Sequence, residues 1–250
     1  VDGLEYVVIP QPWDPNSDVC TAPNNKCTER DYVRIINTTQ NVGINEEIYV
    51  FQTIQPNDTE LVDTQKCNAT WMQAQRKLIF SDAGDWCQIN PKHPTVIFSD
   101  DPDVIFQVYH YARGTDHKGI GDPYMLTLVP REAWICNHRF VSMEDYDDPW
   151  CPSPSGSTED GNYITIIAPS DALDTRLDDN PLIGWNILPF PFNDLMWVTK
   201  WLPDNPYPSS QEHWVEGYRL GQIETPVGVY VHGYSECHGS YAYPAGMRFW

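Results

Sequence analysis

The sequence lacks any long hydrophobic run, since no stretch approaches the roughly 18 consecutive apolar residues that a membrane-spanning helix requires. It is also poor in basic residues, with 15 Lys and Arg against 35 Asp and Glu and a formal net charge of −20. Because phosphate backbones are bound through Lys and Arg, this charge argues against a nucleic acid partner. It favours solubility, divalent cations or a basic partner. We therefore expect no membrane span and no nucleic acid ligand.

Familiar catalytic and metal-binding motifs are missing as well. There is no C-x-x-C pair, which argues against a structural zinc or redox site, and no G-x-S-x-G nucleophile elbow. No stretch follows the calcium-loop pattern D-x-[DN]-x-[DN]-G. We expect that the protein is not an enzyme and that it requires no cofactor.

Asp and Glu residues form three clusters along the sequence. Calcium prefers oxygen ligands, so one cluster could bind this ion; solvated acidic turns are the alternative interpretation. A glycoside hydrolase needs two carboxylates at a set separation, which a linear sequence does not reveal. The clusters comprise Asp100, Asp101 and Asp103, then Glu144, Asp145, Asp147 and Asp148, and finally Asp171, Asp174, Asp178 and Asp179.

One constellation could hold a transition metal. His232, Glu236 and His238 would point to the same side of a continuous strand, and two imidazoles with a carboxylate suit such an ion. Gly233 and Gly239 favour a break in the strand, however, and the spacing matches no zinc protease. Surface histidines in a loop are the competing interpretation.

Helical periodicity is scarce, and 22 Pro residues are spread along the chain. Short alternating or β-branched runs predict strands, for example at Leu4–Ile9, Asp31–Asn37 and Glu46–Ile54. Two segments predict short helices: Cys67–Leu78, with Thr70 as N-cap, and a capping box at Ser209–Glu212 that opens a helix through Leu220. The predicted fold is mainly β, with antiparallel sandwich-like domains, short helical turns and disulfide staples.

The predicted domain organisation follows changes in composition. Residues 1–13 form an N-terminal strand with a Pro-rich extension, and residues 14–145 form a glycosylated β domain. Residues 146–162 are acidic and then rich in Pro, Ser and Gly, as in a linker or long loop. Residues 163–250 form an aromatic-rich β domain. The alternative is one continuous domain.

Seven cysteines and three N-glycosylation sequons indicate an extracellular, secreted glycoprotein with N-linked glycans. The sequons are centred on Asn37, Asn57 and Asn68. Nearest-neighbour pairing suggests the disulfides Cys20–Cys27, Cys67–Cys87 and Cys136–Cys151, although connectivity does not follow from sequence. Cys237 is then left over, either as a buried thiol or as an intermolecular disulfide.

The segment Pro181–Trp250 contains five of the ten Trp residues and no sequon. Its aromatic side chains could form core, a sugar-stacking platform or a protein interface. A surface that carries an attached glycan is not available for protein contact. The absence of sequons from this segment therefore favours a protein interface. The residues that we expect at such an interface are Tyr6, Val8, Trp13, Trp201, Phe249 and Trp250.

These features predict a structural subunit of an extracellular glycoprotein assembly, such as a filament, surface appendage or coat. Copies of the chain would associate into a homo-polymer through the unglycosylated aromatic face and the terminal segments, because head-to-tail contacts generate open polymers. One alternative is a secreted carbohydrate-binding protein or glycoside hydrolase. The other is a metal-dependent secreted enzyme at His232, Glu236 and His238.

Overall fold

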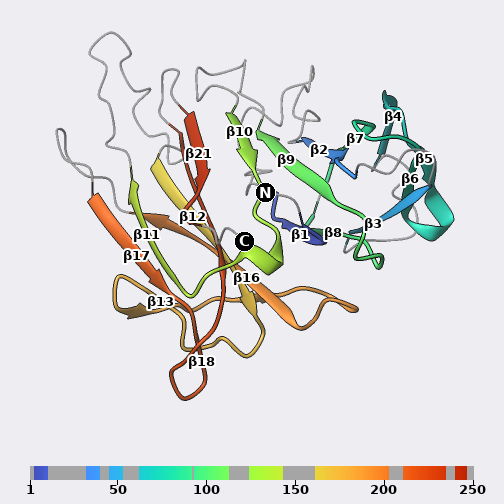
Figure 1. The fold of residues 1–250 in the computed structure, drawn as a ribbon. Coiled ribbons are helices and arrows are strands. Elements are labelled where there is room, and N and C mark those ends of the chain that lie inside the picture. Colours follow the sequence, from blue (N-terminus) through green and yellow to red (C-terminus); the bar gives the residue numbers. More distant parts are fainter. Residues whose placement is uncertain are drawn as a thin grey trace, which may run out of the picture. The chain divides into compact units, whose positions relative to one another are not determined.

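The computed structural model describes residues 3–10, 32–39, 45–52, 62–91, 93–112, 124–142, 161–202, 211–234 and 240–246 (Figure 1). These residues form strands β1–β21 and two short 3₁₀-helices, η1 and η2. The strands pair in antiparallel fashion. The predicted mainly β, antiparallel, sandwich-like fold is confirmed.

The elements before residue 145 are β1 (Glu5–Val8), β2 (Tyr32–Asn37), β3 (Glu46–Gln52), β4 (Val62–Cys67), β5 (Thr70–Met72), η1 (Gln73–Gln75), β6 (Lys77–Phe80), β7 (Trp86–Ile89), β8 (Thr95–Phe98), β9 (Phe106–Ala112), β10 (Tyr124–Thr127), η2 (Arg131–Ala133) and β11 (Asn137–Ser142). The later ones are β12 (Gly161–Pro169), β13 (Arg176–Leu177), β14 (Asn180–Pro181), β15 (Asn186–Ile187), β16 (Leu195–Leu202), β17 (Gln211–Glu216), β18 (Tyr218–Arg219), β19 (Ile223–Glu224), β20 (Gly228–Tyr234) and β21 (Ser240–Pro244).

The chain divides into two compact units. Unit 1 comprises Val1–Arg113 and Met125–Glu132, and unit 2 comprises Gly114–Tyr124 and Ala133–Trp250. The boundary therefore differs from the one predicted near residue 145. Strand β11 pairs along its whole length with β17, which places Asn137–Ser142 in unit 2. Most of the predicted linker 146–162 lies outside the described residues.

Unit 1 contains two five-stranded sheets, in the orders β1-β8-β3-β6-β5 and β10-β9-β2-β7-β4. Buried and half-buried residues alternate along β2 and β3, as a strand with one face on a core requires. Val33 and Ile35 of β2 and Ile48 and Val50 of β3 are fully buried. The period-two patterns in the sequence thus correctly predict both strands.

The N-terminal strand β1 belongs to the core of unit 1. It pairs with β8, and Tyr6 and Val8 are 0% exposed. The Tyr6 ring packs against the Phe106 ring, and the Tyr6 hydroxyl donates a hydrogen bond to the Phe106 carbonyl oxygen. The expectation that Tyr6 and Val8 face a neighbouring molecule is therefore wrong, because other residues of unit 1 bury both side chains.

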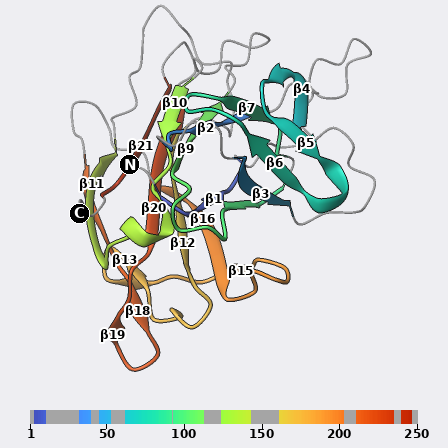
Figure 2. The same ribbon diagram turned by 45° about the vertical axis from the view of Figure 1, so that its right-hand side comes forward.

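Unit 2 contains the sheets β11-β17-β13-β14 and β15-β16-β12-β20-β21, with the small hairpin β18-β19 (Figures 1 and 2). Strand β12 is central and pairs with both β16 and β20. Its residues Ile164, Ile166 and Ala168 join one apolar core with Val198 and Val229. Burial of this face fixes the register of the three strands, since a one-residue slip would expose it.

Neither of the two predicted helices exists. The segment Cys67–Leu78 forms β5, η1 and β6, and Trp71 and Leu78, predicted on one helix face, are cross-strand partners. Arg76 adopts a left-handed conformation that reverses the chain between the strands. The segment after Ser210 forms β17, which pairs with β11 and β13. Sheet pairing with distant strands overrides local helix signals here. Among the described residues no helix is long and apolar enough to cross a membrane.

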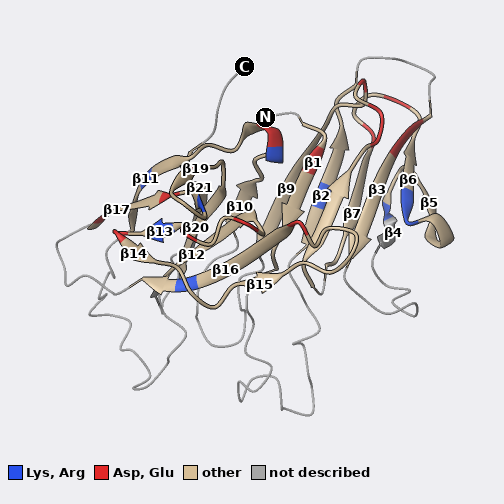
Figure 3. Cartoon of the chain, turned by 90° about the horizontal axis from the view of Figure 1, so that it is seen from below, with Lys and Arg blue, Asp and Glu red and all other residues tan. Residues whose placement is uncertain are grey.

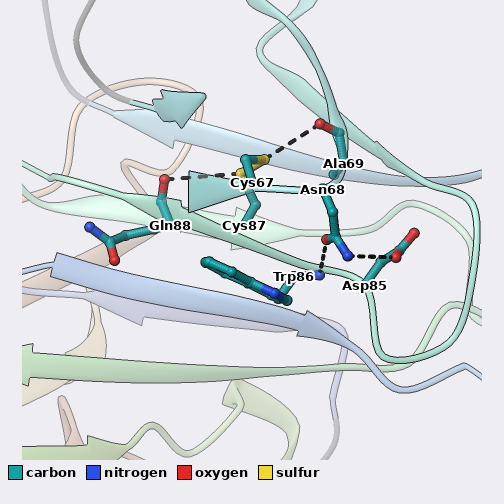
Figure 4. Close-up of a disulfide and its surroundings, with 7 residues drawn as sticks. All are labelled: Cys67, Asn68, Ala69, Asp85, Trp86, Cys87 and Gln88. Atoms are coloured by element: carbon teal, nitrogen blue, oxygen red, sulfur yellow. Dashed lines mark hydrogen bonds between the residues drawn. A yellow bond between two sulfur atoms is a disulfide. The ribbon is translucent and has the colours of Figure 1, made fainter. Parts of the chain in front are cut away.

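A disulfide staples unit 1 at its sheet β10-β9-β2-β7-β4. Cys67 of β4 and Cys87 of β7 are register partners and are bonded, which confirms the predicted pair (Figure 4). Beside the bridge, the Asn68 side-chain oxygen accepts a hydrogen bond from the Trp86 backbone N–H at 2.6 Å. The bridge and this bond both hold the end of β4 against β7.

Candidate functional site

Among the described residues of unit 2, the most exposed large apolar side chains lie on one segment, Leu182–Leu195, which we call the apolar segment. Phe190 is 82% exposed, Ile183 72% and Ile187 65%. The segment runs through β15 and the loop that leads into β16 (Figure 2). Several large apolar side chains that are exposed to solvent on one segment are typical of interaction sites.

The apolar segment is fixed by anchors that alternate with its exposed residues. Leu182, Leu188 and Leu195 are buried, and Trp185 packs on the core of unit 2. Each exposed side chain lies between two buried anchor residues along the chain. It therefore cannot turn into the core unless the anchored backbone moves. The exposure of Phe190 is thus a property of the fold.

Backbone hydrogen bonds hold the same segment in place. The Leu188 N–H donates to the Leu195 carbonyl at 2.9 Å, and the Phe192 N–H donates to the Pro189 carbonyl at 3.0 Å. The Trp185 indole N–H donates to the Leu182 carbonyl at 3.2 Å. A segment that is ordered before binding loses less conformational entropy when a partner arrives. The geometry therefore suits a preformed contact surface.

A second, smaller exposed group lies at the β18-β19 hairpin. Leu220 and Ile223 are both 63% exposed there. The hairpin tip is tied to the preceding turn, since the Gly221 N–H donates to the Asp174 carboxylate at 3.1 Å and Arg219 pairs with Asp171 at 3.4 Å. This hairpin offers fewer large side chains than the apolar segment.

A hydrogen-bonded chain of Ser142, His213 and Asp178 has the connectivity of a catalytic triad. The Ser142 Oγ lies 3.2 Å from His213 Nε2, and His213 Nδ1 lies 2.7 Å from Asp178 Oδ2. A triad nucleophile must reach its substrate, but Ser142 is 0% exposed. The Asp178 Oδ1 also accepts the Trp214 N–H at 2.9 Å. The chain of bonds cross-links β11, β17 and the β13-β14 turn.

The sequence does not predict this cross-link, because its members come from three separate segments without a recognisable motif. Only Asp178 was among the residues considered for chemistry, as part of an acidic cluster. Its carboxylate is occupied by His213 and Trp214. In another cluster, the Asp101 carboxylate accepts the Asp103 N–H at 2.9 Å. These bonds agree with acidic turns, while calcium binding stays a prediction.

The predicted metal constellation is only partly visible. His232 is 1% exposed and its ring stacks on Tyr163, whereas Glu236 and His238 lie outside the described residues. Within the described ranges no group of three His, Cys, Asp or Glu side chains is placed to hold a metal ion. The metal-dependent enzyme thus remains an untested alternative.

The described sequon asparagines differ sharply. Asn37 is 1% exposed, and its side-chain N–H donates to the Asp82 carbonyl at 3.1 Å. Asn68 is exposed at the end of β4, with its side-chain N–H on the Asp85 carboxylate at 2.9 Å. Asn57 lies outside the described residues. Access for a glycan is therefore better at Asn68 than at Asn37.

The remaining predicted site residues have mixed outcomes. Cys136 carries a free, half-buried thiol, and its suggested partner Cys151 lies outside the described residues. Burial, followed by the nearby Glu224 carboxylate, raises the pKa of this thiol. Trp201, an expected interface residue, is 53% exposed. The predictions for Trp13, Cys20, Cys27, Cys151, Cys237, Phe249 and Trp250 fall on residues outside the described ranges.

The exposed residues of the apolar segment were absent from the predicted interface. Ile183, Ile187 and Phe190 lie in a stretch without strand or helix periodicity, between Gly and Pro residues. Such a stretch predicts a loop, and large apolar residues in a loop are the signal that could have identified them.

Comparison with known proteins gives one result. A family model described as IgGFc binding protein matches residues 3–233, which includes most of both units. No curated protein and no solved structure matches the chain. The family match supports the extracellular location that the sequons and cysteines predict. The chain belongs to the IgGFc binding protein family.

Proposed function

We propose that this chain is an extracellular binding module that associates with other proteins through the apolar segment, and first of all with copies of itself in a glycoprotein assembly. The observation that carries the proposal is the exposure of Ile183, Ile187 and Phe190 on an anchored backbone. Fully burying one such side chain contributes about 1.5–3 kcal/mol. Burial of all three would contribute about 4.5–9 kcal/mol before the entropy cost of association is subtracted.

The edge position of β15 adds a second mode of contact. β15 is the outermost strand of the sheet β15-β16-β12-β20-β21. Edge strands leave backbone N–H and C=O groups open on one side, and these groups can pair with a strand of another chain. Backbone pairing at β15 would bring Ile187 directly against the partner.

The net charge predicts how self-association responds to salt. Two chains of formal charge −20 repel each other, and added salt screens this repulsion over a Debye length of about 8 Å at physiological ionic strength. The apolar contact itself strengthens with excluded salts such as sulfate. Self-association through the apolar segment should therefore become tighter as salt is added.

The test uses the double variant Ile187→Ser/Phe190→Ser. Light scattering after size-exclusion chromatography, with negative-stain imaging, should show concentration-dependent association of the wild-type protein and its loss in the variant. The matched control is Leu220→Ser/Ile223→Ser, which removes two side chains of similar exposure from the β18-β19 hairpin. A wild-type protein that stays monomeric at high concentration, or equal loss in both variants, would refute self-association through this segment.

A second candidate function is binding to the Fc region of immunoglobulin G. The observation that favours it is the family description, which matches nearly the whole chain. Surface plasmon resonance with immobilised Fc fragment tests it directly. Binding that is lost in Ile187→Ser/Phe190→Ser and kept in the hairpin control would assign the apolar segment to Fc. Absence of binding by the wild-type protein would exclude this candidate and leave self-association unaffected.

A further inference from the structure

One face of the sheet β10-β9-β2-β7-β4 in unit 1 carries a cluster of four aromatic side chains around a single arginine. The residues are Tyr32, Arg34, Trp86, Tyr109 and Tyr111, and all are half-buried. Their neighbours along the strands, such as Val33, Ile35 and Val108, are fully buried and point to the opposite face. The strand alternation thus gives this sheet one apolar face and one aromatic face, which we call the Arg34 face.

The Arg34 guanidinium is surrounded by rings. Its carbon lies 5.0 Å from the centre of the Trp86 ring, 5.4 Å from that of Tyr111 and 5.7 Å from that of Tyr32. The rings of Tyr32 and Tyr111 stack at 4.6 Å with an angle of 8° between their planes. Tyr109 is the register partner of Arg34 on β9. Contacts of a cation with aromatic faces hold the guanidinium in one place.

Arg34 has no anionic partner among the described residues, although the chain contains 35 Asp and Glu. Its Nε is buried without a hydrogen-bond partner. Other basic side chains of unit 1 are paired: Lys77 lies 2.6 Å from Glu47, and Arg131 lies 2.9 Å from Glu5. Figure 3 marks Lys and Arg in blue, and the basic residue of β2 is Arg34. A half-buried guanidinium that is held by rings and has no carboxylate partner in the described part of the chain is a site that an external anion can complete.

The surroundings select the kind of anion. Arginine presents planar N–H groups that match a carboxylate in two parallel hydrogen bonds. One positive charge in a chain of net charge −20 does not suit a polyanion such as nucleic acid. The strands β2, β7 and β9 are all paired on both sides, so this face offers no open edge for an extended peptide. The half-buried tyrosine and tryptophan rings around Arg34 instead provide apolar faces that suit a sugar.

We infer that the Arg34 face binds an acidic saccharide. The guanidinium would donate hydrogen bonds to the sugar carboxylate, and the surrounding aromatic rings would pack on the sugar ring. This site is in unit 1 and is independent of the apolar segment in unit 2. A negative result for saccharide binding would therefore not affect the proposed association with proteins, and the reverse also holds. The interaction depends on one charge pair at a partly solvated surface, so its affinity should fall as salt is added.

The experiment titrates the glycosylated protein with three probes: 3′-sialyllactose, 3′-sulfolactose and lactose. Calorimetry gives the affinities, and quenching or shifts of tryptophan fluorescence report contact near Trp86. Sialyllactose should bind at least about tenfold more tightly than lactose, as expected for a charge-assisted hydrogen-bond pair. Arg34→Lys keeps the charge but loses the planar pair of donors, so binding should weaken by about tenfold. Arg34→Gln should abolish it.

The matched control is Arg176→Lys in unit 2, where the guanidinium carbon lies 6.0 Å above the Tyr218 ring. This variant should bind sialyllactose as the wild type does. Equal binding of lactose and sialyllactose, tighter binding of sulfolactose, or displacement of sialyllactose by equimolar acetate would each overturn the assignment of a carboxylate sugar. Should the Arg34 variants fail to fold, the three-probe comparison on the wild type alone still decides the question.

Discussion

Tyr6 provides the sharpest test of whether the N-terminal strand is core or contact surface. The Tyr6 side chain is 0% exposed, its hydroxyl lies 2.7 Å from the Phe106 carbonyl oxygen, and its ring lies 5.1 Å from the Phe106 ring. Tyr6→Phe keeps the ring and removes this hydrogen bond, so unit 1 should lose about 0.5–1.5 kcal/mol of unfolding free energy, because the Phe106 carbonyl still accepts the Gly3 N–H at 3.4 Å. Tyr6→Ala also removes the ring and should cost about 3–5 kcal/mol.

The assay must separate the two units, since a two-unit chain need not unfold in one step. Hydrogen exchange followed by mass spectrometry does so, because peptides from β8 and β9 report on unit 1 and peptides from β12 and β16 report on unit 2. Faster exchange should appear in unit 1 in the order wild type, Tyr6→Phe, Tyr6→Ala. Trp201→Ala is the control: Trp201 lies in unit 2 and is 53% exposed, so this variant should leave hydrogen exchange in unit 1 unchanged. Lost self-association with unchanged exchange in Tyr6→Ala would show that Tyr6 is an interface residue and would refute the reasoning.

Three further predictions concern pH, the disulfide and the glycans. Burial lowers the pKa of His138 in the folded state. The contribution of His138 to the free energy of unfolding is therefore complete above the unfolded-state pKa of about 6.5 and is lost as pH falls through the lower folded-state pKa. Urea titrations at several pH values should show a weaker dependence of the unfolding free energy on pH in His138→Gln than in the wild type. Replacing Cys67 and Cys87 by Ser, which opens a loop with a sequence separation of 20, should cost about 3 kcal/mol, and an unchanged denaturation midpoint would contradict the bridge. Glycopeptide mass spectrometry should find Asn68 occupied and Asn37 largely unoccupied, because Asn37 is buried and hydrogen-bonded; full occupancy of Asn37 would contradict its placement.

The sequence predicts most of the strands because a half-buried strand leaves a period-two pattern of its own. Glu46–Gln52 and Tyr32–Asn37 follow that pattern, and both strands lie where it places them. The false helix at Cys67–Leu78 arose because Trp71, Ala74 and Leu78 also satisfy helical spacing. What decides between the two is the pairing of β5 with β6 and of β4 with β7, together with the disulfide, and local spacing does not contain this information.

The boundary between the units depends on strand pairing, which composition does not show. The acidic, Pro-rich composition after residue 145 suggests a linker, but β11 before it pairs with β17 after it, a connection over about seventy positions. Likewise, the Pro-rich stretch after Ile9 does not reveal which strand β1 pairs with, whereas the Tyr6 hydroxyl bonds to Phe106, one hundred residues away. Composition describes the flexibility of a connection and does not reveal which strands the connection joins.

The apolar segment shows why the candidate site could not be read from the residue types alone. Leu188 and Phe190 are two residues apart and equally apolar, yet Leu188 is 1% exposed and Phe190 is 82% exposed. The difference comes from the tertiary structure, in which the Leu188 N–H bonds to the Leu195 carbonyl and the Leu188 side chain is buried, while the Phe190 side chain stays in solvent. Leu188→Ala should accordingly lower the unfolding free energy of unit 2 by about 2–5 kcal/mol, while Phe190→Ala should leave it within about 0.5 kcal/mol and weaken association instead. Equal stability losses in the two variants would mean that Phe190 is also core, and the proposed contact surface would then have to be abandoned.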